Sequence, residues 1–216
     1  MKNKTLTIKK DFFMKKIMFN DKWELTQAVL EGRKTMTRRI VPLSLYNQVD
    51  WKAVEEDGKY NSMVDGDEYY HDIRNCGRYR IGDIVAIAQA YKDVPPYKED
   101  EEFSGFSDLQ AGWNNKMFVS ATRMPHHIKI TNVRVERLQA CSDDDILKEG
   151  VFQISAPIYR HYNGIGYTFK GWTERDIECS SDTPKGAFKA LINKTCGRGT
   201  FESNPYVFVY EFELID

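Results

Sequence analysis

A short basic segment holds side chains whose types and spacing could bind or transform a ligand. Arg33, Lys34, Arg38 and Arg39 lie close together, with Thr37 among them. A guanidinium offers a planar fork of donors to a phosphate or a base edge, and a lysine becomes a base near neutral pH when it is desolvated. The segment is therefore a candidate ligand-binding rim, although a solvated basic loop would account for the same charges.

Two predicted elements position this segment. Residues 21–31 have the pattern of a helix that ends at Gly32. Residues 37–41 resemble a short strand, and the proline that follows ends it because proline cannot donate to an interior ladder. Since residues i and i+2 of a strand share a face, Thr37 and Arg39 are expected to point the same way.

Hydrophobic periodicity and turn residues predict the remaining elements. The strands are 84–90, 117–121, 128–138 and 206–214, and the helices are 142–150 and 185–195. Three segments without a sustained period are expected to be long insertions near 43–79, 92–115 and 152–183. A phase change near Asn132 indicates a bulge. This order fits one α+β domain over residues 1–216, with short helices packed over a small mixed barrel.

Composition narrows the class of protein. The 31 basic and 32 acidic residues nearly cancel, so a nucleic-acid contact would have to be local. No run approaches the ~20 apolar residues of a membrane span, and charges interrupt the stretch where a secretory signal would be apolar. The four cysteines are widely spaced and favour reduced thiols over a zinc site or a disulfide framework. We therefore expect a cytoplasmic protein that needs no cofactor.

Two other groups of side chains were considered as sites. His126 and His127 are adjacent, but no carboxylate or cysteine stands at ligand spacing, so we predict no metal. Tyr91 ends a predicted strand and is the best candidate for stacking on a base. For most other aromatic residues, packing in the core is the simpler explanation.

Four segments resemble the ASCH domain family, a branch of the PUA-like superfamily, and especially its phage-encoded and prophage-encoded members. They are Gly32-Arg33-Lys34-Thr35-Met36-Thr37-Arg38-Arg39, Tyr79-Arg80-Ile81-Gly82-Asp83-Ile84-Val85, Met124-Pro125 with residues 130–139, and Asn204-Pro205-Tyr206-Val207-Phe208-Val209-Tyr210-Glu211-Phe212. The segments occur in the family's order over residues 17–214. The resemblance implies a PUA-like barrel and a pocket for RNA or a nucleoside-like ligand. Its binding residues would be Arg33, Lys34, Arg38, Arg39, Gln89 and Tyr91, with Arg38 on the rim.

Small amidohydrolases of the same superfamily imply a catalytic set. They use a lysine, a threonine three residues later and a glutamate on a following short helix, which Lys34, Thr37 and Glu149 match by position. In that case Thr37 is the nucleophile, Lys34 its base, and Glu149 orients the pair, and the reaction is deacylation of a modified cytidine.

One departure from the family bears on both functions. Many phage relatives carry an Arg-Glu pair where this chain has Ala88 and Gln89, so a charge is missing from the expected pocket. Binding of RNA or a nucleoside is the leading prediction, and the amidohydrolase is the alternative. A third alternative is a phage-encoded protein that uses its acidic insertions to bind a host factor.

Overall fold

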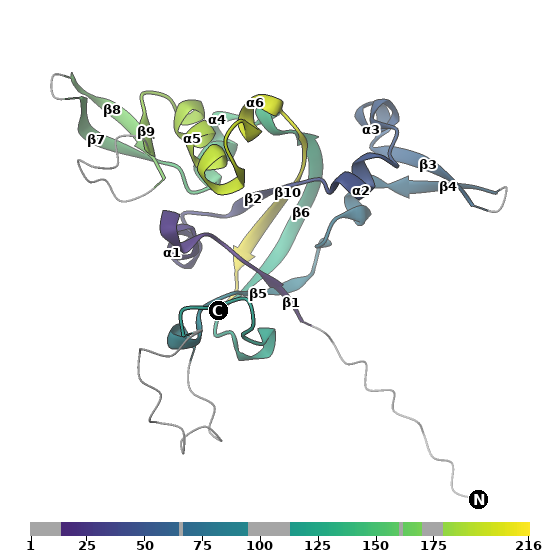
Figure 1. Cartoon of the computed structure of the whole chain (residues 1–216), viewed down its shortest axis with the longest axis horizontal. Coiled ribbons are helices and arrows are strands. Elements are labelled where there is room, and N and C mark those ends of the chain that lie inside the picture. Colours follow the sequence, from purple (N-terminus) through teal and green to yellow (C-terminus); the bar gives the residue numbers. More distant parts are fainter. Residues whose placement is uncertain (1–13, 65–66, 95–112, 160–161, 170–178) are drawn as a thin grey trace, which may run out of the picture.

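A mixed five-stranded sheet forms the centre of the molecule (Figure 1). The computed structural model describes residues 14–64, 67–94, 113–159, 162–169 and 179–216. Along the sheet the strands are β1 (Lys15–Ile17), β5 (Ile84–Ile87), β6 (His127–Arg137), β10 (Tyr206–Leu214) and β2 (Met36–Ile40). β1 runs parallel to β5, and the other neighbours are antiparallel. The α+β class predicted from the sequence is confirmed.

The two faces of this sheet have different chemistry. Residues directly opposite each other in an antiparallel pair share a face. Thr37 is paired with Tyr210 on one face, whereas Val209 is paired with Arg38 on one side and with Arg134 on the other, which places both arginines on the second face. Alternation along β2 thus sends Thr37 and Arg38 to opposite sides of the sheet.

Short helices and two smaller sheets surround the central sheet. The helices are α1 (Leu25–Leu30), α2 (Leu43–Tyr46), α3 (Trp51–Asp57), α4 (Asp143–Lys148), α5 (Pro184–Cys196) and α6 (Thr200–Ser203). The smaller sheets are the hairpin β3 (Lys59–Val64) with β4 (Asp67–Asp72), and β7 (Phe152–Tyr159) with β8 (Tyr162–Thr168) and β9 (Ser180–Ser181). The 3-10 turns are η1 (Asp21–Trp23), η2 (Ile73–Cys76), η3 (Tyr91–Asp93), η5 (Ala121–Arg123) and η6 (Leu138–Ala140). Figure 1 shows the two small sheets projecting on opposite sides of the central one.

The central sheet is open rather than closed as the predicted barrel requires. β1 and β2 are its two edges, and no ladder joins them in the part of the chain described. β1 has only three residues before the chain turns into η1. Side chains bridge the gap instead: Arg39 Nη2 donates to the Met18 carbonyl at 2.7 Å, and the rings of Phe19 and Phe212 lie 5.9 Å apart.

Two of the predicted insertions contain regular structure. Residues 43–79 form α2, α3 and the β3–β4 hairpin, which share a small core of Val49, Val54, Tyr60 and Ile73. Within 152–183 the structure describes β7, β8 and β9. Most of the segment 92–115 lies outside the described residues. Short strands carry little periodic signal, so the regular structure inside these segments could not be inferred from the sequence.

Other predicted elements differ in detail. The predicted helix 21–31 is divided into η1 and α1 because Glu24 adopts a left-handed conformation with φ of 55°. Residues 117–121 form no strand; their backbone carbonyls accept hydrogen bonds from Lys16 Nζ, at 2.7 Å for Met117 and 2.6 Å for Val119. The bulge is confirmed by a register shift between Glu211 and Phe212, opposite Asn132.

The structure also bears on the thiols and on membranes. Cys76, Cys141, Cys179 and Cys196 are all free, as predicted. Among the described residues no helix has the length and apolar character needed to cross a membrane.

Candidate functional site

A buried ion pair joins two of the predicted site residues. Lys34 Nζ lies 2.6 Å from Glu149 Oε2 and donates a second hydrogen bond, of 2.8 Å, to the Glu149 carbonyl. The two residues are 2 % and 4 % exposed, and their backbones form an isolated antiparallel bridge. The structure thus brings together residues that are 115 positions apart in the chain.

Backbone contacts fix this pair from both sides. Lys34 N donates to the Ala28 carbonyl of α1 at 2.8 Å, and Thr35 N donates to the Lys148 carbonyl of α4 at 2.9 Å. Glu149 is the residue that caps the C-terminus of α4. The next residue, Gly150, has a φ of +97°, and a Cβ there would lie 3.5 Å from the Cβ of Lys34. The chain can therefore leave α4 at this point only through a residue that tolerates positive φ.

The environment of Lys34 lowers the pKa of its amine. Burial lowers the pKa of Lys34, and this effect outweighs the opposing influence of Glu149, while the charges of Arg39 and Arg38 lower the pKa further. A neutral amine has two N–H donors and one lone pair. Because two acceptors on Glu149 already face the nitrogen, the lone pair is left to accept a proton from another group.

Thr37 and Arg39 lie on the face of β2 opposite to Arg38, as predicted. Lys34 Nζ is 5.9 Å from the centre of the Phe19 ring, and the Arg39 guanidinium is 5.8 Å from the same ring. Thr37 lies between these two cations along the chain and is 5 % exposed. Within the described residues, no side-chain hydrogen bond joins Thr37 to Lys34 or Glu149. Its hydroxyl is therefore not held by either of them.

Arg38 is inside the fold rather than on a rim. Its side chain is 1 % exposed, and its guanidinium contacts three carboxylates: Glu149 at 3.0 Å, Glu136 at 2.8 Å and Asp145 at 3.1 Å. It also lies 5.6 Å from the Phe188 ring of α5. Burial alone would lower the pKa of Arg38, but Glu149 and Glu136 together raise it. A ligand would have to displace carboxylates to reach this residue.

The ion network continues across the sheet through β6 and β10. Arg134 pairs with Asp145 at 2.5 Å and with Glu136 at 3.1 Å, and it also pairs with Glu211. Arg134, Glu136 and Asp145 were not selected as site residues from the sequence. The alternation of Arg134 and Glu136 on β6 was a usable sign, but their partners are distant in sequence and only the fold identifies them.

Three other predicted ligand residues lie apart from this pair. Arg33 pairs with Glu31 at 2.6 Å and stacks on Phe152. Tyr91 is in η3 and packs against the separate cluster that contains Ala86. Gln89 Oε1 is buried without a hydrogen-bond partner in the described part of the chain. The structure thus shows no contact between these residues and the Lys34–Glu149 pair.

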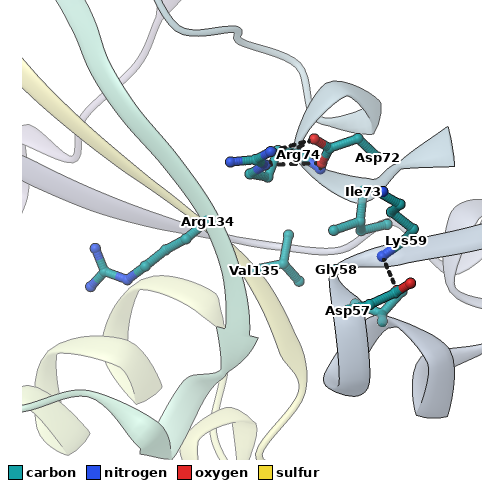
Figure 2. A pocket seen from close by; sticks show the side chains of 9 residues that line it. Asp57, Gly58, Lys59, Asp72, Ile73, Arg74, Arg134 and Val135 are labelled. Atoms are coloured by element: carbon teal, nitrogen blue, oxygen red, sulfur yellow. Dashed lines mark hydrogen bonds and ion pairs between the residues drawn. The ribbon is translucent and has the colours of Figure 1, made fainter.

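A cleft of about 340 Å³ lies between α3, the β3–β4 hairpin and β6 (Figure 2). None of the predicted site residues lines it. Arg74 is paired with Asp72 at 2.5 Å, and Arg134 projects away from the cleft in Figure 2. Arg74 is thus already occupied by a neighbouring carboxylate.

In the described residues no group of histidine, cysteine, aspartate and glutamate side chains could hold a metal ion; His127 instead contacts Asp216 at 2.7 Å. The chain matches no protein-family model, and searches of curated proteins and of solved structures found no match.

Proposed function

We propose that this protein hydrolyses an amide, with Thr37 as nucleophile, Lys34 as base and Glu149 as the group that orients the lysine. The observation that carries the proposal is the buried Lys34–Glu149 pair. A lysine with a lowered pKa, whose donors are occupied by a carboxylate and a carbonyl, suits a general base. This favours catalysis over simple binding, because Lys34 and Arg38 are paired with Glu149 and offer little free charge to a bound phosphate.

The reaction would proceed in two balanced stages. Thr37 Oγ attacks the amide carbonyl while its proton passes to the lone pair of Lys34 Nζ. The C–N bond then breaks, and the leaving amine takes that proton, which leaves an ester on Thr37. Water then attacks the ester carbonyl and gives a proton to Lys34, the acyl bond to Thr37 Oγ breaks, and Thr37 Oγ takes that proton back. One amide and one water thus give one acid and one amine.

The substrate class proposed is an N-acylated pyrimidine nucleoside. Support comes from the resemblance of residues 32–39 to the ASCH signature and from the antiparallel arrangement of β5, β6, β10 and β2. A PUA-like fold remains part of this proposal, with the open edge between β1 and β2 as a departure from a closed barrel. Because Arg38 is paired with carboxylates, Arg39 is the next cation to Thr37 along the strand. It would contact a polar group of the substrate.

Binding of RNA or a nucleoside without turnover is the second candidate. Arg39 favours it, since its side chain is partly exposed and lies over the Phe19 ring. In that case binding should weaken as salt screens the contacts to phosphate. The proposal of a protein that binds a host factor through acidic insertions stays a prediction, because residues 95–112 lie outside the described structure.

The test is release of free acid from a panel of acylated cytidines. Thr37→Val removes the hydroxyl at nearly constant volume and should abolish turnover, whereas Thr37→Ser should retain part of it. Thr122→Val, the same change at an exposed threonine in η5, should leave turnover unchanged. The thermal melt of each variant should match that of the wild type, which checks that the variant is folded. Wild-type protein that releases no acid from any amide would exclude this function and leave binding.

A further inference from the structure

Arg38 uses its whole donor set inside the protein. Nε and Nη2 both contact Glu136 Oε1, at 3.3 and 2.8 Å, and Nη2 also contacts Asp145 Oδ2 at 3.1 Å. Nη1 contacts Glu149 Oε1 at 3.0 Å and Met36 Sδ at 3.4 Å. Five N–H groups are matched by five contacts, so the orientation of the guanidinium is fixed.

The carboxylate of Glu149 is divided between two cations. Arg38 holds Oε1 and Lys34 holds Oε2. A carboxylate with a single partner can rotate about its last torsion, which is a broad one. With both oxygens held, the position of Oε2 relative to Lys34 Nζ is set by Arg38 and, behind it, by Glu136 and Asp145.

We propose that Arg38 is a positioning residue for the Lys34 base: it anchors Glu149 through Oε1, directs Oε2 to the amine, and competes with the amine for the negative charge of the carboxylate. The inference rests on the proposed function for its catalytic meaning. The dependence of the Lys34 pKa on Arg38 can be measured without any substrate.

The charged groups around Lys34 give this effect a direction. Glu149 at the end of α4 faces it directly, while Arg39 and Arg38 on β2 oppose its protonation. Behind Arg38 stand Asp145 of α4, Glu136 and Arg134 of β6, and Glu211 of β10. Without the charge of Arg38, more of the negative charge of Glu149 acts on Lys34, so its pKa rises and less neutral amine is present at neutral pH.

The first experiment is a titration of the Lys34 amine by NMR in the full chain. Arg38→Gln should raise the pKa of Lys34 by about one unit. At a pH below that pKa, this corresponds to about tenfold less neutral amine. Arg38→Lys keeps the charge but not the fork and should give a smaller rise. Arg134→Gln is the matched control, since in the described structure Arg134 shares Glu136 and Asp145 with Arg38 but is not paired with Glu149. It should leave the pKa of Lys34 unchanged.

The second experiment is the pH profile of kcat/KM for amide hydrolysis. In Arg38→Gln the acidic limb should move to higher pH, and activity should recover on the alkaline plateau. An equal loss of kcat/KM at every pH, or the same shift of the acidic limb in Arg134→Gln, would show that Arg38 has only a general structural role. If the wild type shows no turnover, the proposed function fails, but the titration still decides the dependence of Lys34 on Arg38. An unchanged titration in a folded Arg38→Gln protein would overturn the inference.

Discussion

At the scale of single residues, the balance of charge around Glu149 determines what Lys34 can do. A buried lysine with one carboxylate partner is a structural ion pair, and many such pairs have no function. Here the same carboxylate is shared with a buried arginine, and burial lowers the pKa of the lysine. The pKa of Lys34 is thus lowered by burial and by the charges of Arg38 and Arg39, although Glu149 raises it.

Removal of the charge of Glu149 should reduce stability in a pH-dependent way. Glu149→Gln leaves Lys34 buried without a carboxylate, and breaking such a pair costs about 3–5 kcal/mol. The pKa of Lys34 in the folded protein is lowered and falls further in the variant. The unfolded chain therefore binds more protons at this residue than the folded chain does. The penalty relative to wild type is therefore full below the folded pKa of Lys34 in the variant, shrinks as pH rises above it, and disappears above the folded pKa of Lys34 in the wild type.

Urea unfolding at neutral and at alkaline pH measures this effect. The difference between wild type and Glu149→Gln should narrow at the higher pH. A penalty that is the same at both values would show that lost packing, and not the charge of Lys34, accounts for it.

The sequence identified some of these residues and misplaced others. Lys34, Thr37 and Glu149 were selected together through the family resemblance, and the structure places Lys34 against Glu149; their catalytic roles stay predictions. Arg38 was assigned to the rim although strand alternation already placed it opposite Thr37 and Arg39. What the sequence could not show is that α4 and α5 cover that second face.

At the scale of elements, the turn before β5 is packed against β10. Gly77 follows η2, and a Cβ there would collide with the Tyr210 hydroxyl and approach the Phe208 ring at 3.0 Å. The same hydroxyl accepts a hydrogen bond of 3.1 Å from Arg78 N. The absence of a side chain at Gly77 thus lets the 73–79 segment lie directly on the core.

Gly77→Ala should destabilise the protein by about 1–3 kcal/mol, the usual cost of overpacking. Chemical denaturation measures it, and a double-mutant cycle with Tyr210→Phe identifies its cause. If the hydroxyl is the obstacle, Gly77→Ala should cost less in the Tyr210→Phe background than in wild type. Simple additivity of the two changes would contradict this explanation.

Elements with strong local signals were predicted well and the others poorly. The β10 strand and the helix capped by Ser142 were recovered, the latter because Ser142 accepts a hydrogen bond from Asp145 N. The helix at 21–31 was overextended because nothing local marks Glu24 as left-handed. β3 and β4 were missed since their six-residue strands are mostly polar, so no alternating apolar pattern was available.

At the scale of the whole molecule, an aromatic stack attaches the α2–α3 and β3–β4 region to the central sheet. The rings of Trp51 and Tyr206 are stacked 4.0 Å apart, and the Arg137 guanidinium lies 3.8 Å from the other side of the Tyr206 ring. Tyr46 stacks on Trp51 at 5.3 Å. Residues from an insertion and from two sheet strands meet in this column.

Trp51→Ala should loosen the attached region while leaving the central sheet intact. Aromatic pairs contribute about 0.5–1.5 kcal/mol beyond the area they bury, so local opening should become easier in α3, β3 and β4. Hydrogen exchange measures this: amides of residues 51–72 should exchange faster, and those of β6 and β10 should keep their protection. Tyr46→Ala, at the more exposed end of the stack, should have a smaller effect. Faster exchange throughout the chain would show instead that the stack stabilises the sheet itself.

Closure of the sheet was the feature that the sequence could not decide. Periodicity located β2, β5, β6 and β10, but a barrel also needs its two edges to meet. In the described residues no ladder joins β1 to β2, and Arg39 contacts the Met18 carbonyl across the gap. Such a contact depends on one side chain and leaves no pattern in the sequence.

The position of β10 has a consequence for how the protein is made. It is the last strand in sequence but lies between β6 and β2 in the sheet, and Phe212 N also donates to the Thr35 carbonyl. A ribosome releases the chain from its N-terminus, so β2 and the segment that carries Lys34 cannot join the sheet until residues 206–214 have emerged. The segment that carries Lys34 therefore reaches its place beside the sheet only after synthesis has passed this strand.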